Sequence, residues 1–343
     1  MLQAYIPYFP EIMEMKTTRR LLTTLATLAL GSMLVSQAWA QAKVTIYTAA
    51  PQDLIDQVIP AFEKSAKVKV ELIKGGSGDL INRLKAEKGR QTADVLFSVS
   101  TEVIEANASL FTKYAPENVK FLADAFKIND AAVPFTAVAT SIGVNTKQLT
   151  PAQYPKSWTD LANPLYKGKL SAARPDKSGS AFIQLATILQ IYGEDKGWDL
   201  YAKILDNAVL SNSSGAVPKF VNDGEAAVGL SNEDTLLKFK VGGGPVELLY
   251  PADGTSASAD VMALTASPIN AEGGKAFINF MLSQEAQELV DAAGRRSIRT
   301  DVVSKNALTP LSKIKLIKYN EDWAGANRAR ILAKWNDLLL NKK

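Results

Sequence analysis

The feature that most constrains the fold is a regular alternation of strand-like and helix-like segments along residues 43–305. Lys43–Thr48 alternates and is rich in strand-forming residues, whereas Asp53–Ser65 places its apolar side chains at helical spacing. The same rhythm returns at strand-like 68–73, 94–99, 169–173, 226–230 and 246–250, and at helix-like 79–88, 181–192 and 271–293. Alternating strands and helices favour mostly parallel sheets covered by helices, so we predict an α/β fold.

The chain is too long for one hydrophobic core, which usually serves at most about 250–300 residues. We therefore expect two lobes, connected by extended segments near Val133–Val144 and Tyr250–Ala263. The predicted boundaries are 41–138 plus 256–305 for lobe 1 and 139–255 for lobe 2. Residues 306–343 form a C-terminal tail ending in a helix-like run, Trp323–Leu340, which we expect to pack on a lobe.

Residues 1–40 have the pattern of a signal peptide. Lys16, Arg19 and Arg20 precede the uncharged apolar stretch Leu21–Val35, and Ala38–Ala40 supplies a small-x-small cleavage site. The stretch is short for a membrane span, although a retained anchor is the alternative. Translation from Met15 would give a conventional signal peptide without residues 1–14. We expect export to a bacterial periplasm with cleavage after Ala40.

Two residue types are missing from the sequence, cysteine and histidine. Without them, a disulfide framework, a zinc–thiolate site, a cysteine nucleophile and a Ser-His-Asp triad are all excluded. Catalysis would have to use Asp, Glu, Lys, Tyr or Ser, so we predict a protein that is not an enzyme. The formal net charge of +4 is too weak to indicate a nucleic acid or a membrane surface as partner.

Small hydroxyl residues and glycines follow several predicted strands, at the points where helices begin. A helix N-terminus presents unpaired N–H groups, and serine hydroxyls with close glycine backbone add further donors, which together can hold an anion. Ordinary helix capping by serine is the alternative at each junction. Neither Walker A spacing nor a GxGxxG motif is present. The candidate anion-binding residues are Ser77, Ser100, Ser178, Gly179, Ser180, Ser213 and Ser214.

Three further candidates lie at strand ends. Glu233 and Asp234 directly follow an apolar strand and could accept hydrogen bonds from ligand hydroxyls or pair with an amine. The alternative is a helix whose first turn carries favourable acids. Thr48 ends the first strand and would face the same cleft. Arg295–Arg299 could attract an anion, but a solvated charge run next to the preceding helix fits the pattern better.

The order of these segments resembles the periplasmic solute-binding proteins of ABC importers, in the branch with ferric-binding, hexose-phosphate-binding and aminoethylphosphonate-binding members. The likeness covers roughly residues 43–305. It is carried by VTIYTA, by GGSGDLINRLKAEKGRQTADVLFSVS, by RPDKSGSAF, by LSNSSGAVPKFVNDGEAAVGLSNED, by LLYPADGTSASADVMAL and by AEGGKAFINFMLSQEAQELVDAAGRRSIRTDV. The resemblance implies the type II fold, in which two α/β lobes close on a ligand held in the cleft between them.

The resemblance also bears on the ligand. Ferric-binding members place adjacent tyrosines after the segment matched by Ala226–Leu230, where this chain has Asn232, Glu233 and Asp234. The loop matched by Ser178–Ser180 binds an oxyanion in such proteins. A small phosphorylated or phosphonate solute is therefore favoured, with Glu233 and Asp234 holding its hydroxyl or amine end.

We accordingly expect a monomeric binding protein that needs no cofactor or metal and delivers its solute to an inner-membrane ABC permease. The alternative within this class is ferric iron or a ferric chelate, held by Glu233, Asp234 and isolated tyrosines. Two other classes are an exported thiaminase-like transferase, whose cysteine nucleophile is missing here, and a sensor-input protein that docks on a membrane receptor. The sequence does not separate the sensor from the importer.

Overall fold

The computed structural model describes Met1 and residues 43–340, except for 88, 91, 125 and 127–130. The predicted signal peptide, residues 1–40, thus lies almost wholly outside the described residues. Within the described part of the chain, no helix has both the length and the apolar character that a membrane span requires.

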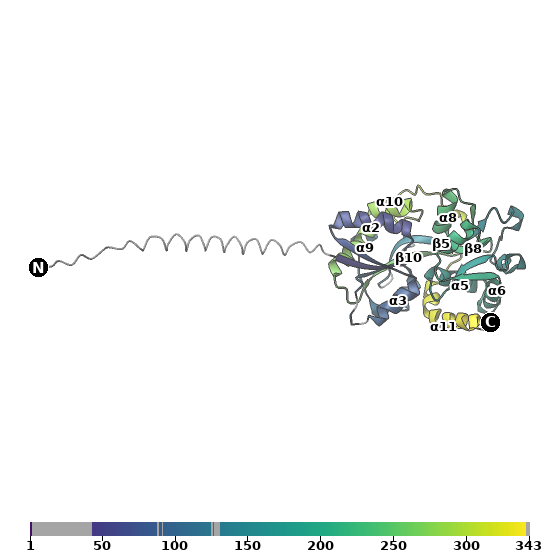
Figure 1. The fold of residues 1–343 in the computed structure, drawn as a ribbon, viewed down its shortest axis with the longest axis horizontal. Helices are drawn as coiled ribbons and strands as arrows, with labels where there is room; N and C mark the ends of the chain where they lie inside the picture. The colour runs from purple at the N-terminus through teal and green to yellow at the C-terminus, as the bar shows by residue number, and fades with distance from the viewer. Residues whose placement is uncertain (2–42, 88, 91, 125, 127–130, 341–343) are drawn as a thin grey trace. The chain divides into compact units, whose positions relative to one another are not determined.

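Residues 43–340 form a mixed α/β sheet with flanking helices, which confirms the predicted fold class (Figure 1). The strand order is β2-β1-β3-β10-β5-β8-β6-β7, with β4 paired to β10 and β9 paired to β5. The strands are β1 Lys43–Thr48, β2 Lys69–Lys74, β3 Val95–Ser100, β4 Phe111–Thr112, β5 Val133–Asn145, β6 Leu170–Ala173, β7 Ala208–Ser211, β8 Val228–Asn232, β9 Val246–Leu249 and β10 Ala257–Thr265.

The two ends of the sheet are parallel, and its centre is antiparallel. Strand β1 pairs in parallel with β2 and β3, and β6 pairs in parallel with β7 and β8. In the centre, β10 runs antiparallel to both β3 and β5. The helices are α2 Gln52–Ala66, α3 Ser77–Ala86, α4 Thr101–Glu105, α5 Gly179–Tyr192, α6 Glu194–Asn207, α7 Val217–Asp223, α8 Glu233–Val241, α9 Ala271–Met281, α10 Gln284–Ala292 and α11 Glu321–Leu340.

The hydrophobic core is divided along the sheet. Apolar side chains of α2, α9 and α10 cover one face of the β1 end, and those of α5, α6 and α11 cover the β6 end. Strand β5 connects the two regions: its first half pairs with β10 and its second half with β8 and β9. All thirteen of its residues are buried.

One helix prediction was wrong. The apolar stripe of Ala271–Ala293 predicted a single long helix, but the chain forms α9 and α10 with a break at Leu282–Ser283. The Ser283 hydroxyl accepts a hydrogen bond from the Ala286 N–H at 3.1 Å and so begins a new helix. The apolar periodicity continues across the break and hides it.

The C-terminal helix α11 contacts both regions of the core. Ala324, Ile331 and Trp335 are buried against the β6 end. Just before the helix, the Tyr319 hydroxyl donates to Glu102 of α4 at 2.7 Å, on the β1 side. The tail therefore contacts both regions of the core.

We expect Glu321, at the start of α11, to make the protein less stable as the pH rises from about 4.5 to 7. Burial and the nearby charges of Glu102 and Glu105 raise the pKa of Glu321 to about 7, from an ordinary value of 4.5. A raised carboxyl pKa contributes stability that is complete below the unfolded-state value and is lost as the pH passes the folded-state value. Allowing for solvent screening, the loss should be about 1–2 kcal/mol.

Melting temperatures between pH 4.5 and 8 test this expectation. The Glu321→Gln variant should flatten the decline of the wild-type melting temperature, whereas Asp322→Asn, at the exposed neighbouring carboxylate, should not. An identical decline in wild type and Glu321→Gln would contradict it.

Candidate functional site

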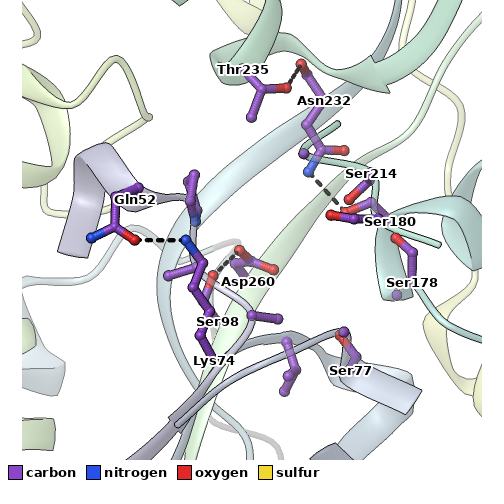
Figure 2. A pocket seen from close by; sticks show the side chains of 18 of the residues that line it. Gln52, Lys74, Ser77, Ser98, Ser178, Ser180, Ser214, Asn232, Thr235 and Asp260 are labelled. Atoms are coloured by element: carbon purple, nitrogen blue, oxygen red, sulfur yellow. Dashed lines mark hydrogen bonds between the residues drawn. The ribbon is translucent and has the colours of Figure 1, made fainter. Parts of the chain in front are cut away.

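A cavity of about 490 Å³ is formed where loops from both ends of the sheet meet (Figure 2). From the β1 end it is lined by residues 49–53 after β1, by 74–77 at the end of β2 and the start of α3, and by the last residues of β3, 98–100. From the β6 end it is lined by 178–180, 212–215 and residues of α7 and α8. Ligands in α/β sheets bind at the carboxyl ends of strands, and this cavity has that position.

Seven of the ten residues predicted to bind ligand line this cavity: Ser77, Ser100, Ser178, Gly179, Ser180, Ser213 and Ser214. They come from four separate segments between residues 77 and 214 of the sequence. Thr48, Glu233 and Asp234 do not line it.

Gly179, Ser77 and Ser100 converge at one point of the cavity. A Cβ atom added to Gly179 would lie 3.2 Å from Ser77 Oγ and 3.3 Å from Ser100 Oγ. Helices α3 and α5 begin at Ser77 and Gly179, so two helix N-termini meet here. The Ser100 hydroxyl is buried and has no hydrogen-bond partner in the described part of the chain. We call Ser77, Ser100 and Gly179 the cradle.

The serines of α5 have different roles. Ser178 caps the helix, because its hydroxyl accepts a hydrogen bond from the Ala181 N–H at 3.3 Å. Ser180 accepts from the Asn232 side-chain amide at 3.0 Å, which leaves its own proton free to be donated (Figure 2). Capping, the alternative to binding, thus applies to Ser178, while Ser180 retains a donor for a ligand.

The loop before α5 also touches the start of α3. The Gly78 N–H donates to the Lys177 carbonyl at 3.3 Å, and Lys177 pairs with Asp79 at 2.6 Å. A Cβ at Gly78 would lie 2.2 Å from the Asp176 carbonyl oxygen, so only glycine allows this approach. The contact holds Ser77, at the start of α3, next to Gly179, at the start of α5, on the same cavity.

Strand β3 and strand β10 form the floor of the cavity. Ser98 is the extra residue of a β-bulge, since Val261 pairs with Val99 and Met262 with Phe97. Its φ of 62° is unusual for a residue other than glycine. Its hydroxyl donates to Asp260 Oδ2 at 2.8 Å (Figure 2). Bulges of this kind redirect a side chain next to a functional site.

Arg295 lies next to this floor and connects two carboxylates. Its guanidinium donates to Asp234 Oδ2 and to Asp260 Oδ2, both at 2.7 Å, and its side chain is 3% exposed. Burial disfavours the charge of Arg295, but the two carboxylates outweigh it and raise its pKa above the usual value. The predicted solvated arginine run is therefore wrong: Arg295 and Arg299 are buried, and Arg299 stacks on the Phe121 ring.

Glu233 and Asp234 are both buried at the first turn of α8. Glu233 receives two hydrogen bonds from Arg296, at 2.7 and 2.8 Å, one from the Ala139 N–H and one from the Tyr250 hydroxyl. Burial and Glu233 raise the pKa of Tyr250 above its usual value. Thr48 is buried too, and its hydroxyl accepts from the Ala50 N–H at 3.0 Å. These contacts give all three residues a structural role.

Several lining residues were not predicted, and they include charged and amide side chains. At the rim, Lys238 pairs with Asp53 at 2.6 Å, and Lys74 donates to Gln52 at 2.9 Å (Figure 2). Four cationic and two anionic side chains line the cavity, which favours an anionic ligand. The unpredicted lining residues with polar or charged side chains include Gln52, Asp53, Lys74, Ser98, Lys219, Asn232, Lys238, Asp260 and Arg295.

Comparison with known proteins decides the family. Residues 90–322 match the family described as bacterial extracellular solute-binding protein. The chain belongs to this family. Its members are solute-binding components of ABC importers, which bind small ligands and deliver them to a membrane permease, and they are transport proteins rather than enzymes. The predicted family and the predicted lack of enzymatic activity are thereby confirmed.

Individual members are similar over nearly the full length. A putative 2-aminoethylphosphonate-binding periplasmic protein of Salmonella typhimurium is 26% identical over 92% of this chain and 98% of its own. An Fe(3+)-binding periplasmic protein of Serratia marcescens is 25% identical over 86% of this chain and 89% of its own. The structure of the periplasmic binding protein AfuA of Actinobacillus pleuropneumoniae, with exogenous fructose-6-phosphate bound, superposes with a TM-score of 0.83, at 26% identity over 87% of this chain and 98% of AfuA.

Proposed function

We propose that this solute-binding protein captures a small phosphorylated or phosphonate solute in the cavity and delivers it to an inner-membrane ABC permease. The observation that carries the proposal is the cradle. Two serine hydroxyls and two helix N-termini converge there, next to a glycine whose missing side chain leaves room for an oxygen atom. Such neutral donors bind an oxyanion, and the similarity to phosphonate-binding and sugar-phosphate-bound proteins supports this ligand class.

We also propose that the chain is divided into two lobes and a C-terminal tail. We assign 41–138 plus 256–305 to lobe 1 and 139–255 to lobe 2, with β5 and β10 as the hinge strands and 306–343 as a tail across both. Closure of the lobes would bury the ligand and be stabilised by its contacts with both sides. We further propose that residues 1–40 direct export to the periplasm, with cleavage after Ala40, and that the protein acts as a monomer.

The ferric alternative has less support. Glu233 and Asp234, its expected carboxylate ligands, are engaged by Arg296 and Arg295. Among the described lining residues there is no tyrosine. Oxygen ligands for a ferric ion would thus have to come from other side chains.

Thermal-shift and calorimetric screening of residues 41–343 tests the proposal. The ligands are sugar phosphates, phosphonates, inorganic phosphate, ferric citrate and polyamines. A phosphorylated or phosphonate compound should raise the melting temperature and bind with micromolar or tighter affinity. A shift with ferric citrate and none with phosphorus compounds would overturn it.

Two serine variants separate binding from capping. Ser100→Ala should weaken phosphate binding about 10-fold with little change in stability, because the Ser100 hydroxyl has no partner of its own in the described part of the chain. Ser178→Ala should lose about 1 kcal/mol of stability through the missing cap and change binding less. Affinity by calorimetry and stability by chemical denaturation measure the two effects. Equal losses of affinity in the two variants would contradict this division of roles.

A further inference from the structure

The cavity presents the donors of the cradle and, beside them, a carboxylate. The carboxylate is that of Asp260, whose side chain is 18% exposed and which pairs with Ser100 across strands β10 and β3. A ligand held by the cradle therefore meets hydrogen-bond donors and, next to them, an acceptor. The carboxylate can contact the part of the solute that lies outside its oxyanion.

Asp260 is held in a fixed position. Ser98, aimed by the bulge in β3, donates to Oδ2 of Asp260, and Arg295 donates to the same oxygen at 2.7 Å. Both contacts use Oδ2, which leaves Oδ1 available to a bound molecule. Figure 2 shows the second oxygen pointing away from Ser98, toward the side of the cavity where Ser178 and Ser180 lie. The strained backbone of Ser98 indicates that this placement matters for function.

The charges next to the floor also favour a donor. Arg295 carries one positive charge and faces two carboxylates, those of Asp234 and Asp260. One negative charge of this buried group is therefore left uncompensated. Among the lysines that line the cavity, Lys238 pairs with Asp53, Lys219 pairs with Asp223, and Lys74 donates to the uncharged side chain of Gln52. A ligand ammonium or hydroxyl at Asp260 would supply the missing donor, whereas an anion there would be repelled.

We propose that Asp260 is the specificity-determining residue of the cavity, and that it accepts a hydrogen bond from a hydroxyl or ammonium group that the solute carries outside its phosphorus group. This inference rests on the proposed oxyanion site. It transfers to Asp260 the role that the sequence predicted for Glu233 and Asp234. The solute class is thus an amino- or hydroxyl-bearing phosphonate or phosphate ester, and simple alkyl phosphonates are poor ligands.

A matched series of ligands tests the inference on the wild-type protein without any substitution. We would titrate residues 41–343 with 2-aminoethylphosphonate, 2-hydroxyethylphosphonate, propylphosphonate, glucose 6-phosphate, fructose 6-phosphate and inorganic phosphate. At least one donor-bearing compound should bind 10-fold or more tightly than propylphosphonate. Binding of propylphosphonate as tight as that of the best donor-bearing compound would overturn the inference.

Variants of Asp260 then test whether this residue accepts the hydrogen bond and whether the ligand donor is an ammonium or a hydroxyl group. Asp260→Asn should weaken an ammonium ligand at least 10-fold, because it removes the charge, and a hydroxyl ligand only about 3-fold, because the amide oxygen still accepts. Asp260→Ala should weaken both at least 10-fold. All three proteins should bind propylphosphonate within 3-fold of one another. Glu247→Gln, at a carboxylate that pairs with Lys240 and does not line the cavity, is the control and should keep the wild-type preference.

The results distinguish a failure of the proposed function from a failure of the inference about Asp260. If no phosphorus compound binds the wild type, the proposed function fails together with the inference. If phosphorus compounds bind but Asp260→Asn and Asp260→Ala retain the wild-type preference, only the inference fails. If circular dichroism shows that both variants are unfolded, the ligand series on the wild-type protein still tests the inference.

Discussion

Replacing Gly179 with alanine is expected to abolish tight binding of the phosphorus compound while leaving the fold intact. The added methyl group would lie 3.2 Å from Ser77 Oγ and 3.3 Å from Ser100 Oγ, in the space assigned to a ligand oxygen. Loss of that oxygen's hydrogen bonds, each worth about 1.5–3 kcal/mol to a charged group, should weaken binding at least 100-fold. Stability should change little, since alanine is a better helix former than glycine by about 1 kcal/mol and offsets the tight contact.

Gly215→Ala is the matched control for this prediction. Gly215 lines the same cavity, but a Cβ there would be 3.6 Å from Ser213 Oγ, an ordinary contact. Its affinity should stay within about 3-fold of wild type. Calorimetry with the best ligand from the screen measures both variants, and wild-type affinity in Gly179→Ala would remove the cradle from the binding site.

The parts of the site that were predicted from sequence are those set by local geometry. Ser77, Ser178 and Gly179 lie at the starts of helices, and the rhythm of strands and helices locates such positions. Because the carboxyl ends of parallel strands meet at one edge of an α/β sheet, serines far apart in the sequence can be expected to lie close together in space. The cavity lining agrees with that reasoning for seven residues.

The parts that were missed depend on pairing between distant residues. Ser98 and Asp260 are 162 residues apart, and the bulge that joins them leaves no periodic signal in the sequence. Glu233 and Asp234 were expected to face ligand because they follow a strand. Two arginines about 60 residues later bind them instead, and nothing in the local pattern distinguishes the two outcomes.

The buried pair of Glu233 and Arg296 gives the largest expected effect on stability. Glu233 is 1% exposed in its side chain and Arg296 is 13% exposed, and they form two hydrogen bonds beside Tyr250. Burial disfavours the charge of Arg296, but Glu233 outweighs it and raises the pKa of the guanidinium. Arg296→Met would leave the carboxylate buried without its cation, so we expect a loss of about 3–5 kcal/mol in the free energy of unfolding.

A double variant tests whether the unpaired charge causes this loss. Glu233→Gln combined with Arg296→Met removes both charges, while the glutamine oxygen can still accept from the Ala139 N–H and its NH2 group can donate to the Tyr250 hydroxyl oxygen. Because no charge is then buried alone, the double variant should lose less than Arg296→Met alone, by about 1–3 kcal/mol. Guanidinium denaturation of the wild type, both single variants and the double variant measures this coupling. Additive losses would mean that Arg296 stabilises the protein through packing and through its contact with the Thr309 carbonyl, rather than through its charge.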